Sequence, residues 1–184
     1  MHRAPKELRA DAQRNYDAIV AAATRVFARG GVNAPLEDVA SEAGVGQGTL
    51  YRHFPTREHL FATILRDRVA HLDARARELL NAEDASTALA EWLRLYDRIG
   101  AEYRGMSALL GHSFSEDGSP MAEMCAPMRE SFRLLFAKAR KQARLRRDVT
   151  ADHVLATIAS LPKHPTTGRT IEPLIDVVLA GLRS

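Results

Sequence analysis

One short stretch of the sequence combines hydrogen-bonding and basic side chains and contains no acid. Residues 47–53 read Gln-Gly-Thr-Leu-Tyr-Arg-His, and no Asp or Glu occurs between Glu42 and Glu58. A surface with these groups suits a negatively charged partner such as a phosphate backbone. Glutamine can bond adenine through two hydrogen bonds, and a threonine methyl group can pack on thymine. The residue types therefore indicate a surface suited to duplex DNA.

Two short helices, over 36–43 and 46–54, are the elements that must position this stretch. Pro35 can open the first, because its missing N–H would have no partner in a first helical turn. Gly44 suits the tight turn between them, since glycine accepts a left-handed backbone at little cost. Gly46 and Gly48 leave the backbone bare where DNA could approach closely. The inward anchors of the second helix are Val45, Leu50 and Phe54. A plain pair of packed helices without a DNA role is the alternative.

The remaining sequence is also patterned as helices, because apolar residues recur at steps of three and four rather than two. The first helix is expected to start near Asp11 and to stop at Gly30-Gly31, and a fourth to run from Thr56 to about Leu80. Further helices are expected near 86–104, 105–114, 120–145, 150–161 and 170–183. The expected fold is all-α, with about nine helices: an N-terminal three-helix helix-turn-helix domain and a C-terminal helical domain.

Composition sets further bounds on function. The 184 residues include 26 basic and 23 acidic ones, a net charge of +3 that favours polyanionic partners only weakly. The single cysteine, Cys125, cannot form an internal disulfide. No apolar run is long enough to span a membrane, and residues 1–7 lack the apolar core of a signal peptide. We expect a cytoplasmic protein with no membrane partner.

Residues 12–61 resemble the TetR family of bacterial regulators. The resemblance rests on Ile-Val-Ala-Ala-Ala-Thr-Arg-Val-Phe at 19–27, on Leu-Glu-Asp-Val-Ala at 36–40 and on Gly-Thr-Leu-Tyr-Arg-His-Phe at 48–54. Further matching pieces are Gly30-Gly31 and Arg-Glu-His-Leu at 57–60. It implies a DNA-binding domain over 8–58 and a ligand-binding and dimerisation domain over 59–184.

The resemblance also implies roles for individual residues. Gln47 and Thr49 would read bases, while Tyr51 and His53 would contact phosphates. Arg57 replaces the family's usual lysine at a phosphate contact, and Pro35 stands where a threonine is usual, so that hydroxyl contact is lost. The full set expected to bind DNA is Arg14, Gln47, Gly48, Thr49, Tyr51, Arg52, His53 and Arg57.

The C-terminal half is expected to hold an effector pocket and a dimer interface, as the resemblance implies. Residues expected to bind the effector are Trp92, Tyr96, Tyr103, Met106, Leu109, Met124, Met128, Phe132, Phe136 and Leu155. Residues expected at the dimer interface are Leu155, Ile158, Leu174, Ile175, Val178 and Leu182. For both sets the alternative is ordinary core packing, which aromatic residues, methionines and leucines at helical spacing usually serve.

Three other features are weighed against simpler interpretations. The most basic run, residues 138–147, is interpreted as a solvated end of a long helix rather than a DNA contact. Cys125 is interpreted as a small core residue rather than a redox sensor. The seven histidines do not show metal-ligand spacing, no catalytic motif stands out, and we expect no metal, no cofactor and no enzymatic activity.

The sequence as a whole predicts a transcriptional regulator that binds a pseudo-palindromic operator as a homodimer and is released by a small molecule. A ligand-independent or activating regulator is one alternative. An enzyme with a DNA-binding appendage is a second.

Overall fold

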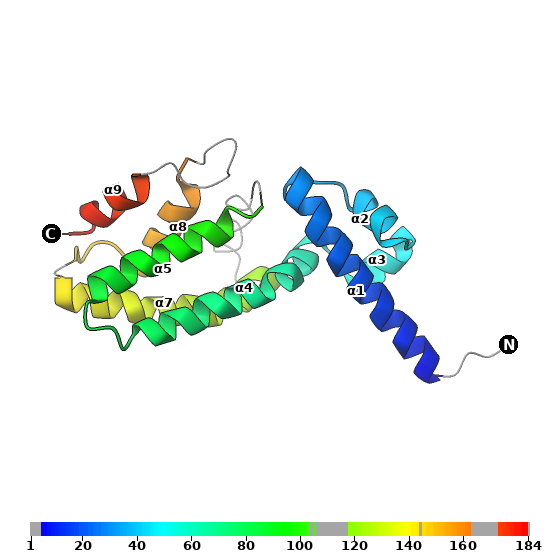
Figure 1. Ribbon diagram of the computed structural model, residues 1–184, viewed down its shortest axis with the longest axis horizontal. Coiled ribbons are helices and arrows are strands. Elements are labelled where there is room, and N and C mark those ends of the chain that lie inside the picture. Colours follow the sequence, from blue (N-terminus) through cyan, green and yellow to red (C-terminus); the bar gives the residue numbers. More distant parts are fainter. Residues whose placement is uncertain (1–4, 104, 106–117, 144, 163–172, 184) are drawn as a thin grey trace. The chain divides into compact units, whose positions relative to one another are not determined.

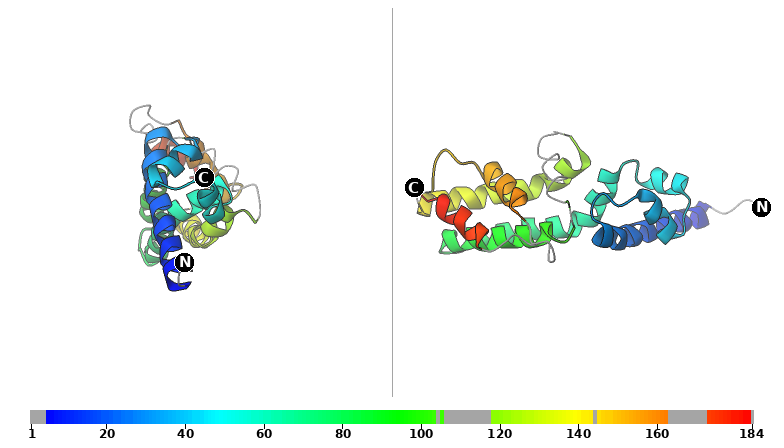
Figure 2. Two further views of the ribbon diagram at one scale, coloured as in Figure 1. Left: turned by 90° about the vertical axis from the view of Figure 1, so that its right-hand side faces the viewer. Right: turned by 90° about the horizontal axis from the view of Figure 1, so that it is seen from above.

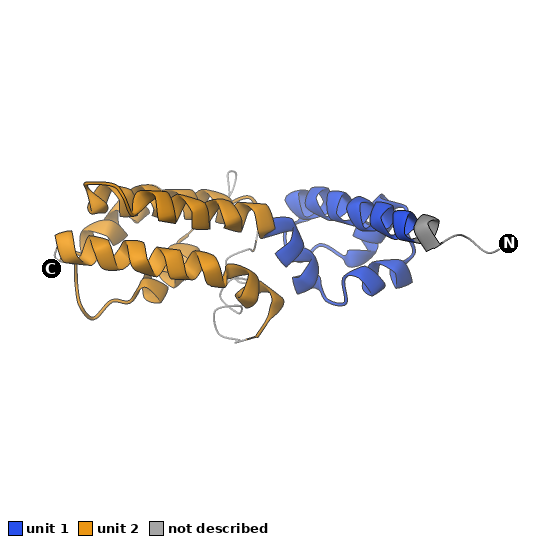
Figure 3. Ribbon diagram, turned by 90° about the horizontal axis from the view of Figure 1, so that it is seen from below, with its two compact units in different colours: residues 1–65 blue, residues 66–184 orange. Residues whose placement is uncertain are grey.

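The computed structural model describes residues 5–103, 105, 118–143, 145–162 and 173–183. All regular elements within these ranges are helices, which confirms the predicted all-α class. The chain divides into two compact units, residues 1–65 and 66–184 (Figure 3). The helices are α1 (Pro5–Gly30), α2 (Leu36–Ala43), α3 (Gln47–His53), α4 (Arg57–Leu79), α5 (Ala85–Gly100), α7 (Pro120–Ala143), α8 (Ala151–Ser160) and α9 (Leu174–Gly181).

The smaller unit contains α1, α2, α3 and the beginning of α4 (Figure 1). Its core centres on the stacked rings of Phe27 and Phe61, whose centroids lie 4.3 Å apart, and both side chains are fully buried. The predicted start of the first helix at Asp11 is wrong, because α1 begins at Pro5. Proline is favourable at a first helical position, and residues 6–10 contain no helix breaker that would delay the start.

The larger unit contains most of α4 and the helices α5, α7, α8 and α9. α5 packs along α7, α8 packs on both of these helices, and α9 packs on α5 (Figures 1 and 2). Trp92 lies at the centre, where its ring stacks on Phe132 at 4.4 Å and its Nε1–H donates to the Leu72 carbonyl at 2.9 Å. The helix predicted near 105–114 lies almost entirely outside the described residues.

The basic run at the end of α7 holds other helix ends in place. Lys138 donates to the carbonyls of Leu80, at 2.8 Å, and of Ala82, just beyond α4. One turn later, the Gln142 side chain accepts from the N–H of Ala85, the first residue of α5, at 3.0 Å. Terminal helix groups of this kind need such partners, because they have none inside their own helix. The expectation of a purely solvated helix end is therefore wrong for this part of the run.

None of the helices in the described ranges is long and apolar enough to cross a membrane.

Candidate nucleic-acid interface

The turn between α2 and α3 has the left-handed backbone at Gly44 that the sequence predicted. Gly44 has φ +67°, and its N–H donates toward the Ala40 and Ser41 carbonyls at the end of α2. The next N–H, of Val45, also donates to the Ala40 carbonyl, at 3.0 Å. Helices commonly end at a glycine with a left-handed backbone, where this N–H and the next one donate back to carbonyls in the last turn. The turn therefore fixes α3 directly after α2, as a helix-turn-helix requires.

Two anchors fix the rotation of α3 about its axis. Leu50 and the C-cap residue Phe54 are 1% and 2% exposed, so the helix buries one side only. The opposite side remains accessible. Gln47, Gly48 and Arg52 are exposed, and Tyr51 is one of the few large apolar side chains with substantial exposure, 44%. The structure thus gathers the predicted base readers and phosphate contacts of α3 on one helix and leaves them accessible, with Thr49 half-buried beside them.

His53 is held more firmly than the other predicted contacts. Its ring meets the edge of the Tyr16 ring at a centroid distance of 6.1 Å, and Tyr16 in turn lies 5.0 Å from Phe54. This aromatic group joins α1 to the end of α3. A side chain fixed in this way loses little conformational entropy when it binds a ligand. The sequence analysis did not identify this contribution of Tyr16.

Arg57 lies at the start of α4 and is half-buried. Its Nη1 donates to the carbonyls of Val32 at 2.9 Å and Ala34 at 2.6 Å, and its guanidinium lies 5.7 Å from the centre of the Phe27 ring. The planar, forked guanidinium can make these contacts together, whereas the point charge of a lysine cannot match them all. The sequence suggested only a phosphate contact here, and the structure adds an anchor for the connection between α1 and α2.

Arg14 lies on an exposed part of α1, where it pairs with Asp11. Its side chain is 69% exposed, and surface pairs of this kind are weak. A phosphate could therefore compete for this arginine at little cost. Its role in DNA binding stays a prediction.

Two arginines that the sequence analysis missed position α2 against α1. Arg25 donates to the Glu42 carboxylate at 2.6 Å, and Arg29 binds the other oxygen of the same group. The hydrogen bonds from Arg29 and Arg25 lower the pKa of Glu42. The two arginines of α1 therefore balance the negative charge of Glu42, which is the last acidic residue before the acid-free stretch. The separations of 17 and 13 residues give no local signal that could have revealed this pairing.

Gly46 is the N-cap of α3, a position at which glycine is common, whereas Gly48 has no role that the fold itself explains. A Cβ atom built at either position would meet no atom within 4 Å, and neither backbone has positive φ. Glycine in a helix costs about 0.5–1 kcal/mol relative to alanine. The domain gives up this stability at Gly48 without a contact or a backbone conformation that demands glycine. An external partner that approaches the backbone closely would account for it.

The residues predicted to bind an effector are mostly central to the core of the larger unit. Trp92, Tyr96, Tyr103, Met128, Phe132, Phe136 and Leu155 are all buried, and Met124 is half-buried. Met106 and Leu109 lie outside the described residues. The Tyr96 hydroxyl is buried and has no hydrogen-bond partner among the described residues. Burial raises the pKa of this phenol well above its ordinary value, so it stays a neutral donor.

Cys125, on the neighbouring α7, is buried as well. Burial raises the pKa of its thiol to about 11. Since the thiolate is the reactive form of cysteine, this environment agrees with the interpretation of Cys125 as a core residue rather than a sensor.

The predicted dimer residues divide into two groups. Leu155 and Ile158 of α8, Ile175 of α9 and Leu182, the C-cap of α9, point into their own subunit, with exposures between 0% and 8%. Leu174 and Val178 are half-buried, and their neighbour Val177, which was not predicted, is 60% exposed. An interface on α9 would therefore be carried by the second group.

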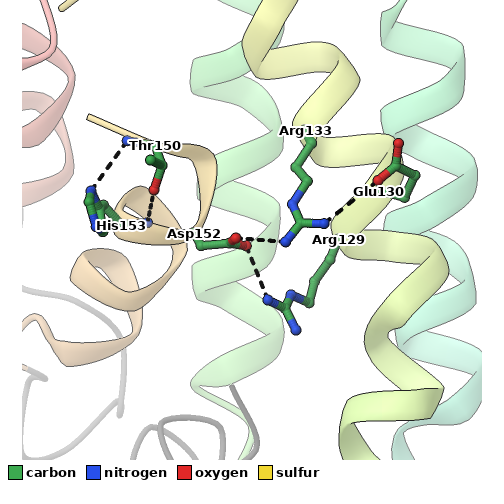
Figure 4. Close-up of polar contacts among 6 residues, drawn as sticks. All are labelled: Arg129, Glu130, Arg133, Thr150, Asp152 and His153. Carbon is green, nitrogen blue, oxygen red and sulfur yellow. Dashed lines mark hydrogen bonds and ion pairs between the residues drawn. The ribbon is translucent and has the colours of Figure 1, made fainter. Parts of the chain in front are cut away.

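The start of α8 is tied to α7 by charge. Asp152 accepts from Arg133 at 2.7 Å and from Arg129 at 3.4 Å (Figure 4). Thr150 caps the helix by accepting from the His153 N–H at 3.1 Å, while the His153 ring accepts from the Thr150 N–H at 3.3 Å. The first turn of α8 is thus held at both its backbone and its carboxylate.

Comparisons with known proteins agree with this architecture. The sequence model described as bacterial regulatory proteins, tetR family, matches residues 19–64, and that of the SbtR-like transcriptional regulator C-terminal domain matches residues 84–184. A search of curated proteins gave no match.

Solved structures extend the likeness over nearly the whole chain. The TetR transcriptional regulator SCO0520 from Streptomyces coelicolor is 36% identical, with a TM-score of 0.55 over 91% of this chain and 98% of that one. A TetR transcription regulatory protein from Mycobacterium vanbaalenii is 32% identical, with a TM-score of 0.51 over 96% and 99%. Salmonella enterica GusR, at 21% identity, shares the fold, with a TM-score of 0.59 over 92% and 95%. The chain belongs to the TetR family of DNA-binding transcriptional regulators, which confirms the resemblance seen in its sequence.

Proposed function

We propose that this regulator is a homodimeric repressor whose two α3 helices read a pseudo-palindromic operator and which a small molecule releases. The observation that carries the DNA-binding part is the exposed face of α3. It presents Gln47, Tyr51 and Arg52 beside a glycine that no contact inside the subunit requires. Gln47 and Thr49, in the first turn, would reach base edges, because recognition helices contact bases through their N-terminal residues. The functional division proposed is residues 8–58 for DNA and 59–184 for effector and partner.

The experiment is a selection of DNA sites from a random library, with wild-type protein and two single variants. Gln47→Ala should relax base preference at particular operator positions, because a base contact specifies sequence. Tyr51→Phe removes only a hydroxyl from an exposed ring and should weaken binding to all sequences alike, because a phosphate contact positions without reading. A Gln47→Ala profile identical to that of the wild type would refute the assignment of Gln47 as a reader.

The dimer is supported by the accessible faces of α8 and α9. On α8 the exposed positions include Ala156, Thr157 and Ser160, which are small. Thr157 donates to the His153 carbonyl at 2.7 Å and Ser160 to the Ala156 carbonyl at 2.8 Å, so neither hydroxyl needs an outside partner. Small residues with satisfied hydroxyls allow a second helix to approach closely.

The apolar surface of this interface would come from α9, where Val177 is 60% exposed beside the half-buried Leu174 and Val178. In a two-fold symmetric dimer the same patch meets itself, so a single substitution acts twice. Val177→Asp should therefore shift the mass measured by light scattering from two subunits to one. A wild-type mass of one subunit at micromolar concentration would refute the dimer.

The effector site is proposed around Tyr96. Its hydroxyl is a buried neutral donor without a partner among the described residues, and such a group costs free energy until an acceptor is supplied. Helix α7, which packs on α5, buries Met121 and Met128, and the flexible side chains of methionine adapt to irregular shapes. An effector would thus offer a hydrogen-bond acceptor to Tyr96 within an apolar enclosure. Tyr96→Phe should weaken its release of DNA without changing DNA affinity in its absence.

A further inference from the structure

A cavity lies in the larger unit, between α5 and α9. Its volume is about 410 Å³, within the range of small-molecule sites, about 300–1,000 Å³. None of the described residues assigned to the proposed effector site lines it. Its lining residues are Asp84, Ser86, Thr87, Leu89, Ala90, Arg94, Leu145, Asp176, Leu179, Ala180, Leu182 and Arg183.

The wall formed by α9 and the residues after it is one continuous stripe. Asp176, Leu179, Ala180 and Arg183 follow one another at steps of three, one and three residues, which places them on one face. Leu179 and Leu182, which also line the cavity, follow Ile175 by four and seven residues, so this face adjoins the one that holds α9 in the subunit. The lining of the cavity therefore adjoins the core contact of α9 and includes none of Leu174, Val177 and Val178, the residues proposed for the dimer.

The floor of the cavity is apolar. Leu89, Leu145 and Leu182 line it and are at most 6% exposed, while Ala90 and Leu179 are half-buried beside them. An apolar body placed here would cover mainly the accessible surface of Ala90 and Leu179, because the other three leucines are already buried. Burial of such surface contributes about 25 cal/mol per Å².

The charged groups around this floor are unequal in their availability. Arg94 and Asp176 form an ion pair across the cavity at 2.5 Å. Asp84 is occupied as the cap of α5: its carboxylate accepts from the Ser86 N–H at 2.9 Å and from the Thr87 hydroxyl at 2.5 Å. The Arg183 side chain donates no hydrogen bond among the described residues, although its positive charge helps to lower the pKa of Asp84.

We infer that this cavity binds an amphipathic organic anion, with the apolar body on the leucine floor and the anionic group on Arg183. A carboxylate is the chemistry that fits, because a guanidinium presents parallel N–H donors to two carboxylate oxygens. A cationic head group is disfavoured, because the carboxylates of Asp84 and Asp176 already have donors. Net charge does not decide the sign, since the cavity's two acids balance its two arginines. The sign of the ligand's charge is decided instead by Arg183, whose guanidinium donors have no hydrogen-bond partner among the described residues.

Binding here would act directly on α9. Under the proposed function α9 carries part of the dimer interface, so occupancy would change the dimer and with it DNA affinity. This regulatory consequence rests on the proposed function, whereas binding itself does not. The two are therefore measured separately.

The experiment is calorimetric titration of the full-length protein with decanoate at pH 7.5, below its micelle concentration. Decyltrimethylammonium, with the same chain and the opposite charge, is the ligand control. Arg183→Gln should weaken decanoate binding roughly tenfold or more, the loss of about one charge-assisted hydrogen bond. Ala90→Trp, which fills the floor from the α5 side, should abolish it. Arg147→Gln is the matched control, because Arg147 is an exposed arginine two residues after the lining residue Leu145 and does not itself line the cavity.

Three results would overturn the inference. These are no decanoate binding by the wild type, wild-type affinity in Arg183→Gln, or equal weakening in Arg183→Gln and Arg147→Gln. The last would indicate general attraction of the anion by positive charge. Arg183 is exposed, so its variant is expected to fold even where Ala90→Trp does not, and thermal melts of all variants check this. A decanoate effect on DNA affinity is read out by anisotropy in a separate experiment, so a failed regulator assignment leaves the binding result intact.

Discussion

Replacing Gly48 with alanine should make the protein more stable and a poorer DNA binder at the same time. The added methyl group meets no protein atom within 4 Å, and the residue lies in the first turn of α3 with ordinary helical φ. The gain in unfolding free energy should be about 0.5–1 kcal/mol. For a chain of this size that corresponds to roughly 2 °C in Tm.

The loss in DNA affinity has a different origin. If the backbone at residue 48 touches DNA, the methyl group intrudes on a close contact, and such overpacking costs about 1–3 kcal/mol. Affinity should then fall at least about fivefold. Both effects come from a single methyl group, so no change in charge complicates the comparison.

The measurement pairs calorimetric melting with fluorescence anisotropy on a selected operator at one fixed salt concentration. Gly100→Ala is the control, because Gly100 ends α5 in the other unit and likewise has open space around a built Cβ. The Gly100→Ala substitution should leave DNA affinity unchanged. A stabilised Gly48→Ala protein with wild-type affinity would refute close approach of DNA, and a destabilised one would show that the fold itself needs this glycine.

Three further predictions concern the polar contacts of Glu42 and Lys138 and the burial of Cys125. Glu42→Gln should lower the melting temperature at neutral pH, but by less as pH falls below about 4.5, because the lowered pKa of Glu42 makes its stabilising contribution one that acid removes. Cys125 should react with a thiol reagent at pH 8 only at the rate of unfolding, because burial keeps the thiol protonated there; rapid labelling of folded protein would contradict this. Lys138→Met should cost about 1–3 kcal/mol in urea denaturation with an unchanged slope, because two carbonyl groups beyond α4 lose their donor; a loss under 0.5 kcal/mol would argue against the capping role.

The helix-turn-helix was predictable from the sequence because the residues that indicate it lie close together in the chain. The Gly44 turn, the inward anchors Leu50 and Phe54 and the exposed Gln47 all lie within a dozen residues, and the bounds of α2 agree with those predicted. The start of α1 was misplaced because a cap-type residue, Asp11, was preferred over a proline that can begin a helix.

Two of the contacts that sequence reasoning missed join distant segments. Arg25 reaches Glu42 across 17 residues, and Lys138 reaches Leu80 across 58. No periodicity reports such pairs, because a charged residue on a solvated face and one that caps another helix look alike in a sequence. The same limit applies to Ile158, where apolar spacing could not distinguish the subunit's own core from an interface with a second subunit.

The side chains of Lys138 and Gln142 also restrict how this family member can change in evolution. They lie one helical turn apart on α7 and hold the two ends of the connection between α4 and α5, at Leu80 and at Ala85. Surface connections usually tolerate added or deleted residues. Both ends of this connection are bound to the same helix, α7, so the distance between them is fixed. Even one extra residue would therefore break the contact at one end. We therefore expect length variation among its relatives to avoid residues 80–85 and to occur in other connections.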